Sequence, residues 1–467
     1  MLGRTRRIHF VGVGGIGMSG IAELLANLGY EVSGSDAKRS DVTDRLATLG
    51  VRIAAGHDAG NIGTADVVVV SSAVAQTNPE LVAARAAHIP VIPRAEMLAE
   101  LMRLRYGIAV AGAHGKTTTT SMIALVLDRA GLDPTAVIGG RLSAFGSNAR
   151  LGKGEYMVVE ADESDRSFLK LSPSIAVITN IDREHMESYG TWENLQQAFA
   201  DFANKVPFYG AVIACADDRP VRELIPRLTR RTITYALEAE ADIVGRDMTL
   251  EAFGSSCTVT HRTGGRVEQL GPLRLRVPGR HNVLNALGAV AVGVEAGIPF
   301  ARIAAGLEEF QGAERRFQIR GEAEGVLVVD DYGHHPTEVA AVIAAARAGI
   351  GRRVVAVFQP HRFSRTEQLF EAFGPAFKGA DAIVLTDIYA AGEAPIPGIT
   401  VERLADSIRQ GSSSPVELVK NLADVPAAVA QLVRSGDLVL TLGAGSIGTV
   451  GDKILDAIRA RAVRARA

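Results

Sequence analysis

The sequence contains very little cysteine. Its 467 residues include only Cys215 and Cys257, which lie far apart and lack the CxxC spacing of a redox or metal-binding pair. A disulfide framework or a thiolate metal site is therefore not expected. We interpret both thiols as small, buried, apolar side chains.

Neither sign of charge is in excess. The 50 Lys and Arg residues nearly balance the 52 Asp and Glu residues, so the chain has no strong net field. Such a field is what draws many proteins to nucleic acids or to anionic membranes. We therefore expect neither a nucleic-acid partner nor a membrane partner.

Long apolar runs are also missing. No uninterrupted apolar stretch reaches the roughly 18 residues that suggest a transmembrane helix. The opening residues MLGRTRRIHFVGVGGIGMSG combine positive charge with apolar residues, as a signal peptide does. Glycines interrupt that run, however, and favour a strand, a turn and a helix. We predict a soluble, cytoplasmic protein.

The length exceeds what one ordinary core needs and predicts two to four domains. Apolar strands alternate with helical segments in three blocks, which we place at residues 1–104, 105–312 and 313–467. Strands that are apolar on both faces indicate parallel sheets covered by helices on both sides. The second block also contains CTVTHRTGGRVEQL, whose alternation around Gly-Gly is typical of a hairpin. The prediction is an α/β fold built from doubly wound sheets.

A glycine-rich turn follows the first predicted strand. Gly12, Gly14 and Gly17 have GxGxxG spacing, and Asp36 ends the second strand. Such glycines let the backbone approach a diphosphate at a helix N-terminus, and the aspartate can accept a hydrogen bond from a ribose hydroxyl. NAD is the default ligand of this pattern, but a UDP-sugar satisfies the same geometry. A tight turn without a ligand is the structural alternative.

The stretch AGAHGKTTTT resembles a phosphate-binding loop that has been shortened. Only Ala113 and His114 separate Gly112 from Gly115, whereas the usual loop has four residues there. Lys116 and Thr117 nevertheless supply the ammonium for β- and γ-phosphates and the hydroxyl for Mg²⁺. We predict a nucleoside triphosphate site.

Polar side chains follow the next two buried strands of this block. Glu160 and Asp162 end the strand in EYMVVEADESD, and Asn180, Asp182 and His185 follow the strand in SIAVITNID. The carboxyl ends of parallel strands meet at one ligand crevice. Carboxylate and imidazole beside a triphosphate suit Mg²⁺, with Glu160 the best candidate ligand.

A cluster of ionisable residues follows strands of the last block. Such a concentration is costly in a core and belongs in a cleft. Arginines grip carboxylates or phosphates and would repel a zinc ion. The cluster comprises Asp330, Asp331, His334, His335, His361, Arg362 and Arg365.

A diphosphate-sugar site, a magnesium–triphosphate site and an anion-binding third block together suggest an ATP-driven condensation. ATP converts a carboxylate to an acyl phosphate, which an amine then attacks. Two other classes remain as alternatives: an NAD-dependent oxidoreductase, and a nucleotide-binding regulatory module without catalysis.

The same residues resemble the Mur ligases. The motifs that carry this resemblance span all three blocks: HFVGVGGIGMSG, HGKTTTT, EADESD, TNID, GRHNVLNALGA, DDYGHHPTE, HRFSRT and LGAGSIG. The resemblance implies an N-terminal Rossmann-like domain, a central P-loop-type ATPase domain with the added hairpin region, and a C-terminal Rossmann-like domain. It also implies the condensation of ATP, UDP-N-acetylmuramate and L-alanine to ADP, phosphate and UDP-N-acetylmuramoyl-L-alanine. A sister ligase that adds a peptide, as in muropeptide recycling, is the nearest alternative.

The resemblance assigns roles residue by residue. The UDP-sugar would lie against Gly14, Gly15, Gly17, Asp36, Ser71 and Ser72. ATP would contact Gly112, Ala113, His114, Gly115, Lys116, Thr117, Thr118, His281, Asn282, Asn285, Arg316 and Asp331. Thr117 and Glu160 would hold one Mg²⁺ and His185 a second, with Mn²⁺ able to substitute. The amino-acid side of the cleft would comprise Tyr332, His334, His361, Arg362 and Arg365.

Catalysis would depend on Lys116, His185, His334, Arg362 and Arg365, with His334 or His185 as the base. A monomer or a weak homodimer is expected. Two features depart from the family pattern. Ala113 stands where the family commonly has Thr, which removes a hydroxyl from the loop. The carboxylated lysine of several sister ligases has no convincing equivalent, since Lys205 is close in sequence but poorly placed.

Overall fold

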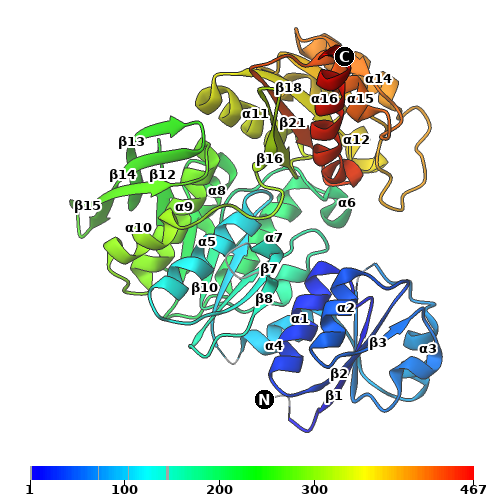
Figure 1. The fold of residues 1–467 in the computed structure, drawn as a ribbon. Coiled ribbons are helices and arrows are strands. Elements are labelled where there is room, and N and C mark those ends of the chain that lie inside the picture. The colour runs from blue at the N-terminus through cyan, green and yellow to red at the C-terminus, as the bar shows by residue number, and fades with distance from the viewer. Residues whose placement is uncertain (1–2, 72, 104, 143–146, 467) are drawn as a thin grey trace. The chain divides into compact units, whose positions relative to one another are not determined.

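The computed structural model describes residues 3–71, 73–103, 105–142 and 147–466. Two compact units make up the chain. The first comprises Met1–Asp247, Thr258–Leu273 and Leu284–Phe310, and the second comprises Met248–Cys257, Arg274–Val283 and Gln311–Ala467. Three sheets run through these units, and helices cover them (Figure 1). The α/β prediction is confirmed.

The first sheet is parallel throughout and has the strand order β3-β2-β1-β4-β5. Its strands are β1 (Arg7–Val11), β2 (Glu31–Asp36), β3 (Arg52–Ala55), β4 (Val67–Val70) and β5 (Val91–Pro93). Alternate side chains of β1 point to opposite faces. Ile8 and Phe10 pack with α1 (Ile16–Asn27), α2 (Asp41–Thr48) and α4 (Arg94–Met102), whereas Val11 packs with α3 (Pro79–Ala86). The sheet is thus covered on both sides, as predicted.

The central sheet has ten strands in the order β15-β14-β13-β12-β11-β10-β6-β9-β7-β8. The strands are β6 (Tyr106–Ala111), β7 (Thr135–Leu142), β8 (Ser147–Arg150), β9 (Tyr156–Glu160), β10 (Ile175–Ile178), β11 (Ala211–Cys215), β12 (Thr232–Ala236), β13 (Ile243–Glu251), β14 (Gly254–Thr263) and β15 (Arg266–Leu275). Gly264 and Gly265 join β14 to β15, and both have positive φ, at 57° and 79°. Two such residues define the tight turn of a hairpin, so the hairpin prediction is confirmed.

Helices lie on both faces of this sheet. They are α5 (Lys116–Arg129), α6 (Met186–Tyr189), α7 (Trp192–Asn204), α8 (Arg219–Leu224), α9 (Arg280–Glu295) and α10 (Phe300–Glu308). Gly293 of α9 lies against Val126 of α5 and Ile303 of α10, so these three helices pack together. On the other face, Phe199 and Phe202 of α7 pack with the core beneath β10 and β11. Cys215 and Cys257 are both buried and free, as predicted.

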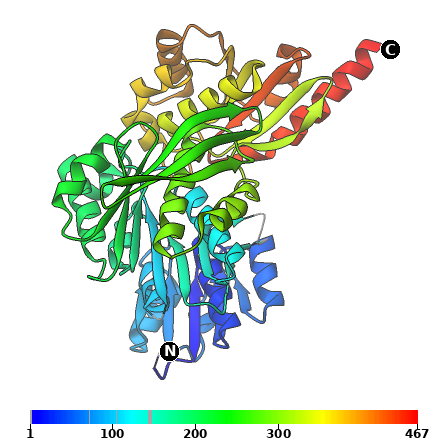
Figure 2. The same ribbon diagram turned by 90° about the vertical axis from the view of Figure 1, so that its left-hand side faces the viewer.

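The third sheet has the order β16-β17-β21-β18-β19-β20 and is parallel except for the edge strand β16. The strands are β16 (Gln318–Ala323), β17 (Val326–Asp331), β18 (Arg353–Phe358), β19 (Ala382–Leu385), β20 (Val416–Leu418) and β21 (Asp437–Leu442). One face packs against α11 (Pro336–Ile350), α13 (Phe373–Ala376) and α14 (Val401–Gly411). The other packs against α15 (Val425–Leu432) and α16 (Gly451–Arg466). Helix α16, in red, runs beside β16 and β17 in Figure 2.

In each sheet, predicted site residues follow the carboxyl ends of neighbouring parallel strands, whereas His281, Asn282 and Asn285 lie on α9 and Arg316 precedes β16. Along the part of the chain that the structure describes, none of the helices has the length and apolarity needed to cross a bilayer. Nothing in this structure tests the predicted boundaries at residues 104 and 312, which stay predictions.

Candidate functional site

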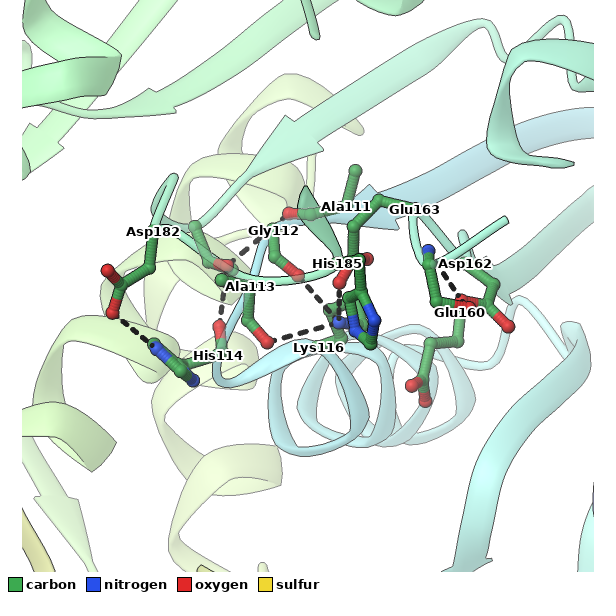
Figure 3. A network of polar contacts seen from close by, with 12 residues as sticks. Ala111, Gly112, Ala113, His114, Lys116, Glu160, Asp162, Glu163, Asp182 and His185 are labelled. Atoms are coloured by element: carbon green, nitrogen blue, oxygen red, sulfur yellow. Dashed lines mark hydrogen bonds and ion pairs between the residues drawn. The ribbon is translucent and has the colours of Figure 1, made fainter. Parts of the chain in front are cut away.

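Three neighbouring strands of the central sheet, β9, β6 and β10, end at the same edge. The loop at Gly112–Gly115 follows β6, the acidic turn with Glu160 and Asp162 follows β9, and Asp182 and His185 follow β10. Figure 3 draws these side chains from close by. Motifs up to 73 residues apart in the sequence therefore share one edge of the sheet, as is typical of ligand sites in open parallel sheets.

The shortened loop is fixed by its neighbours. Gly112 has φ 140° and Gly115 has φ 80°, and both φ values favour glycine. A Cβ on Gly112 would overlap Thr179 Oγ1, and one on Gly115 would lie 2.5 Å from Asn285 Oδ1. The Asn180 side chain clamps the loop because Oδ1 accepts a 2.8 Å hydrogen bond from the His114 amide and Nδ2 donates one of 2.9 Å to the His114 carbonyl. The loop is thus held open ahead of the N-terminus of α5.

Lys116 is the first residue of α5, and its ammonium lies inside the loop. Nζ donates to the carbonyls of Gly112 at 2.6 Å and Ala113 at 3.1 Å, and to Glu163 Oε1 at 2.8 Å (Figure 3). Burial lowers the pKa of Lys116, but Glu163 and Glu160 outweigh burial and hold that pKa above its ordinary value. Lys116 therefore places a positive charge inside the predicted phosphate-binding loop.

Thr117 and Glu160, predicted as ligands of one cation, are in contact. Thr117 Oγ1 donates a 2.9 Å hydrogen bond to Glu160 Oε2. A hydroxyl and a carboxylate at this spacing are hard oxygen donors, the kind that Mg²⁺ prefers. Thr118, the next residue, is buried in α5.

His185 lies beside two carboxylates. Glu163, Glu184 and His185 each offer one ligand atom, and these atoms lie within 4.8 Å of one another. His185 precedes α6 and has a left-handed backbone, with φ 56°. Such a conformation is uncommon outside glycine and is over-represented at functional sites. Burial raises the pKa of Glu163 to about 7, and Lys116 opposes this rise.

His114 and the start of α9 carry the predicted adenine and loop contacts. His114 Nε2 lies 2.9 Å from Asp182 Oδ2. Asn285 Oδ1 accepts a 3.2 Å hydrogen bond from Thr119 of α5, which places it beside the phosphate loop. Asn282 Nδ2 donates 2.7 Å to the Pro278 carbonyl. Burial, assisted by Arg316, lowers the pKa of His281 to about 4, so this ring is neutral at neutral pH.

The N-terminal glycine turn is closed by Asp36. Its Oδ2 accepts a 2.8 Å hydrogen bond from the Gly14 amide, and a Cβ on Gly14 would lie 2.9 Å from that oxygen. The Ser35 carbonyl accepts from the amides of Gly12 and Val13 at 2.9 and 3.0 Å. Gly15 is the N-cap of α1, with its backbone at the helix N-terminus. Ser71 follows β4 next to this turn, while Ser72 lies outside the described residues.

A cavity of about 250 Å³ joins this turn to the phosphate loop. Gly17 and Arg94 line it from the first sheet, and Lys116, Glu160 and Asp162 from the central one. Arg94 Nη2 donates 3.0 Å to Asp162 Oδ2. A Cβ on Gly17 would overlap the Arg94 guanidinium, so the glycine makes room for that cation. The cavity is therefore lined by a residue of each predicted nucleotide motif, Gly17 and Lys116.

In the second unit, Asp331 ends β17 and is buried. Its carboxylate accepts 2.7 Å hydrogen bonds from the amides of Phe317 and Gly333. Burial raises its pKa to about 6, against the effect of Arg316. Arg316 Nη1 lies 3.4 Å from Glu338. The structure therefore places Arg316 and Asp331, two of the predicted ATP contacts of this unit, close together.

The histidine and arginine cluster is also assembled. His334 packs edge-on against Tyr332 and His361, and His361 stacks on Tyr389 with ring centroids 5.6 Å apart. Arg365 Nη1 lies 3.1 Å from His361 Nδ1. Burial, His334 and the nearby arginines lower the pKa of His361 to about 3, which makes it a weak base.

Arg362 belongs to this cluster and has a strained backbone conformation. Its φ is 70°, and its Nε is buried with no hydrogen-bond partner among the described residues. Glu393 is its ion-pair partner, at 3.9 Å. A strained cation with an unused donor is what an anion-binding site needs.

Three residues near the site were missed from the sequence. Glu163 lies in the quoted EADESD run and Glu184 lies beside His185, so adjacency to predicted ligands was the available signal. Arg94 had no local signal because it reaches the cavity from a distant helix. Lys205 lies away from the site and donates to the Leu169 carbonyl, consistent with its exclusion.

The fold and site define a three-sheet α/β protein with a triphosphate loop and a second glycine turn. Family models match nearly the whole chain: Mur ligase family, catalytic domain over residues 7–106; Mur ligase middle domain over 110–293; and Mur ligase, glutamate ligase domain over 315–445. The chain belongs to the Mur ligase family, which confirms the resemblance.

Individual relatives cover the chain from end to end. It is 54% identical over 457 residues to UDP-N-acetylmuramate–L-alanine ligase of Geobacter sulfurreducens, covering 97% of this chain and 98% of that one. Among solved structures, UDP-N-acetylmuramate–alanine ligase from Thermotoga maritima superposes with a TM-score of 0.81 at 29% identity, covering 97% and 99% of the two chains. A murein peptide ligase from Psychrobacter arcticus, at 23% identity and a TM-score of 0.70 with coverage of 97% and 99%, shares the fold.

Proposed function

We propose that this chain is an ATP-dependent ligase that joins L-alanine to the lactyl carboxylate of UDP-N-acetylmuramate. The products are UDP-N-acetylmuramoyl-L-alanine, ADP and phosphate, so the reaction belongs to peptidoglycan precursor synthesis. The observation that carries this proposal is end-to-end identity of 54% with a ligase of that name, together with an intact Lys116 and Thr117–Glu160 arrangement.

The reaction balances in two steps. A lactyl carboxylate oxygen attacks the γ-phosphorus of ATP, ADP leaves, and an acyl phosphate forms. The neutral amine of alanine then attacks the acyl carbon, giving a tetrahedral intermediate that expels phosphate. His334 accepts the proton that the ammonium must lose, or His185 does when it holds no cation. Both steps develop negative oxygen charge, which Lys116, Arg362 and Arg365 stabilise.

Lys116 and the loop bind the triphosphate. The ammonium already lies against the Gly112 and Ala113 carbonyls, and it turns to the β- and γ-phosphates when they enter. Thr117 and Glu160 fit a hard divalent cation, Mg²⁺ or Mn²⁺, and His185 fits a second. Bound cations supply charge neutralisation on the phosphate oxygens. Thr118, His281, Asn282 and Asn285, with Arg316 and Asp331, hold the rest of ATP.

The two remaining ligands have separate binding groups. The UDP part rests on Gly14, Gly15, Gly17 and Asp36, with Ser71 and Ser72 beside it. Tyr332, His334, His361, Arg362 and Arg365 bind the alanine side. We expect the chain to act in the cytoplasm as a monomer or weak homodimer, on small molecules and without a nucleic-acid or membrane partner.

The direct test is phosphate release from ATP with Mg²⁺ and UDP-N-acetylmuramate. Alanine, glycine, serine, a muropeptide tripeptide and no amine are compared. Release that requires both the acceptor and alanine supports the proposal. Release only with the tripeptide would reassign the chain to peptide addition, and no release with any amine would favour a binding module.

A further inference from the structure

The backbone of Arg362 is held in a conformation that a residue with a side chain rarely adopts. Its φ is 70° and its ψ is 141°, a combination that strongly favours glycine. Backbone strain of this kind persists only where the surrounding structure imposes it, and it is concentrated at functional sites. The contacts on either side of Arg362 therefore identify what imposes the strain.

The loop after β19 supplies these contacts. The Tyr389 carbonyl accepts a 2.8 Å hydrogen bond from the Arg362 amide. Glu393 holds the first turn of α12 (Phe363–Gln368), because its Oε2 accepts a 3.1 Å hydrogen bond from the Ser364 amide and its Oε1 accepts one of 2.7 Å from Ser364 Oγ. The loop thus fixes the backbone at Arg362 and just after it.

Glu393 acts on this segment mainly through Ser364. Burial raises the pKa of Glu393, but the hydrogen bonds from Ser364 and the charge of Arg362 outweigh burial and hold that pKa below its ordinary value. Arg362 Nη1 lies 3.9 Å from Glu393 Oε1, and the Arg362 side chain is 43% exposed, so water screens this ion pair. The two bonds from Ser364 are therefore the stronger link between Glu393 and α12.

The same loop explains the glycine-rich motif LGAGSIG, which spans the end of β21 and the turn after it. A Cβ on Gly445 would lie 2.6 Å from Tyr389 Cγ, and one on Gly448 would overlap the Arg315 guanidinium. The Tyr389 ring also stacks on His361. These two glycines accommodate side chains of the protein itself, and Gly445 makes room for the loop after β19.

The arginine that the loop holds keeps a donor for a ligand. Arg362 Nε is buried and has no hydrogen-bond partner among the described residues. Arg365 lies on the same helix, three residues further on. Guanidinium groups bind carboxylates with directional hydrogen bonds, so their orientation decides how tightly they bind. An amino acid that reacts through its amine offers such a carboxylate.

We propose that Glu393 is a positioning residue for the amine substrate. Through Ser364 it holds Arg362 in its strained conformation, so that Nε meets the carboxylate of the amino acid. The inference rests on the proposed function, which supplies the amino acid. Glu393 does not touch the substrate, so its loss weakens amine binding and leaves phosphoryl transfer intact.

The experiment measures phosphate release by the full-length chain as the alanine concentration varies, with ATP and UDP-N-acetylmuramate saturating. Glu393→Ala and Ser364→Ala should each raise the KM for alanine about tenfold, because each removes the same hydrogen bonds to a charged group. Both variants should keep kcat and the KM for ATP. The double variant should be no worse than either single one. Glu367→Ala is the matched control, because Glu367 is exposed on the same helix.

Three results would overturn the proposal: an unchanged KM for alanine in Glu393→Ala, additive effects in the double variant, or a parallel loss of kcat and of ATP affinity. The last result would mean a merely structural role. If only the muropeptide tripeptide supports release, its KM replaces that of alanine.

Hydrogen exchange at the start of α12 gives a readout that needs no turnover. Glu393→Ala should speed exchange of the Ser364 amide, and unchanged exchange would reject the positioning role even in an active enzyme. Faster exchange in this variant, combined with no phosphate release by the wild type, keeps the positioning of Arg362 and rejects the proposed function. Circular dichroism checks that each variant folds.

Discussion

The two glycine turns of the first unit look alike in sequence and are supported in different ways. Each follows a central parallel strand and precedes a helix, and each has a buried glutamate near it. Beneath the N-terminal turn the glutamate is Glu80 of α3. Beside the phosphate loop it is Glu163.

Glu80 is saturated with partners. Oε2 accepts from Ser35 Oγ at 2.6 Å and lies 3.1 Å from His9 Nε2, while Oε1 accepts from Asn61 Nδ2 at 2.7 Å and from the Asp58 amide at 3.2 Å. Burial raises its pKa, but these partners outweigh burial and lower the pKa to about 2. Ser35 in turn holds the glycine turn through its carbonyl.

Glu163 has the opposite balance. One lysine and one bare oxygen leave burial dominant, and the pKa rises to about 7. A buried carboxylate with hydrogen bonds to both oxygens holds the surrounding backbone in place. A buried carboxylate with one unpartnered oxygen can still accept another partner. Glu80 is therefore fully committed to the N-terminal turn, whereas Oε2 of Glu163 has no hydrogen-bond partner among the described residues.

The largest expected effect comes from Glu80. Glu80→Ala leaves His9, Ser35 and Asn61 without their buried partner, which should cost about 3–5 kcal/mol of local stability. Hydrogen exchange across β1 and β2 measures this loss. Glu163→Gln, measured across β6 and β9, should cost clearly less because Lys116 keeps its two carbonyl bonds. Equal losses of local stability in Glu80→Ala and Glu163→Gln would contradict the difference drawn between the two glutamates.

Lys116→Ala should abolish most turnover. Under the proposed function the ammonium stabilises charge on the transferring phosphate, and removal of one such group costs about 10²–10³-fold in kcat. Phosphate release measures turnover, and calorimetry with UDP-N-acetylmuramate should find acceptor binding intact. Lys205→Ala is the control, since that exposed lysine lies away from the loop. Retained turnover in Lys116→Ala would reject the role given to the loop.

The local sequence was sufficient to predict the two glycine turns. GxGxxG and GxxGKT report backbone conformation over a few residues, and the positive φ of Gly12, Gly112 and Gly115 agrees with this reading. The strand-end rule then placed Glu160 and Thr117 together without any knowledge of their contact. Both inferences rest on spacing, which a sequence displays directly.

The residues that support these turns could not be predicted from local sequence spacing. His9 and Glu80 are 71 positions apart and meet only after α3 packs on the sheet. Arg94 reaches the cavity by lying over a glycine of another helix. Contacts of this kind depend on how elements pack, and no local pattern encodes them. Edge strands such as β8 and β16 escaped for the same reason.

The pH dependence of the N-terminal turn should follow Glu80. Its folded pKa, about 2, lies below the ordinary value of 4.5, so ionised Glu80 stabilises the fold above pH 4.5, and this contribution is lost as the pH falls toward 2. Exchange protection of β1, compared between wild type and Glu80→Gln, isolates the effect. Asp331 should behave in the opposite sense. Its folded pKa, about 6, lies above the ordinary value of 3.8, so protonated Asp331 stabilises the fold around β17 below pH 3.8, and this contribution is lost as the pH rises through about 6. Identical profiles for wild type and Glu80→Gln would contradict the assignment.

The smallest effects separate the glycines themselves. Gly115 caps α5 with φ 80°, and an added Cβ would lie 2.5 Å from Asn285 Oδ1, so Gly115→Ala should cost about 1–2 kcal/mol at the start of α5. Gly15 caps α1 with φ −63°, and its nearest neighbour to an added Cβ is 3.6 Å away, so Gly15→Ala should lose only the N-cap preference of glycine over alanine, about 0.5–1 kcal/mol. Exchange at the first turns of both helices measures the two costs. The difference between the two free-energy costs follows from the backbone conformation of each glycine, because both turns share a glycine-rich sequence. An equal loss of helix stability in both variants would mean that the two turns are equally strained.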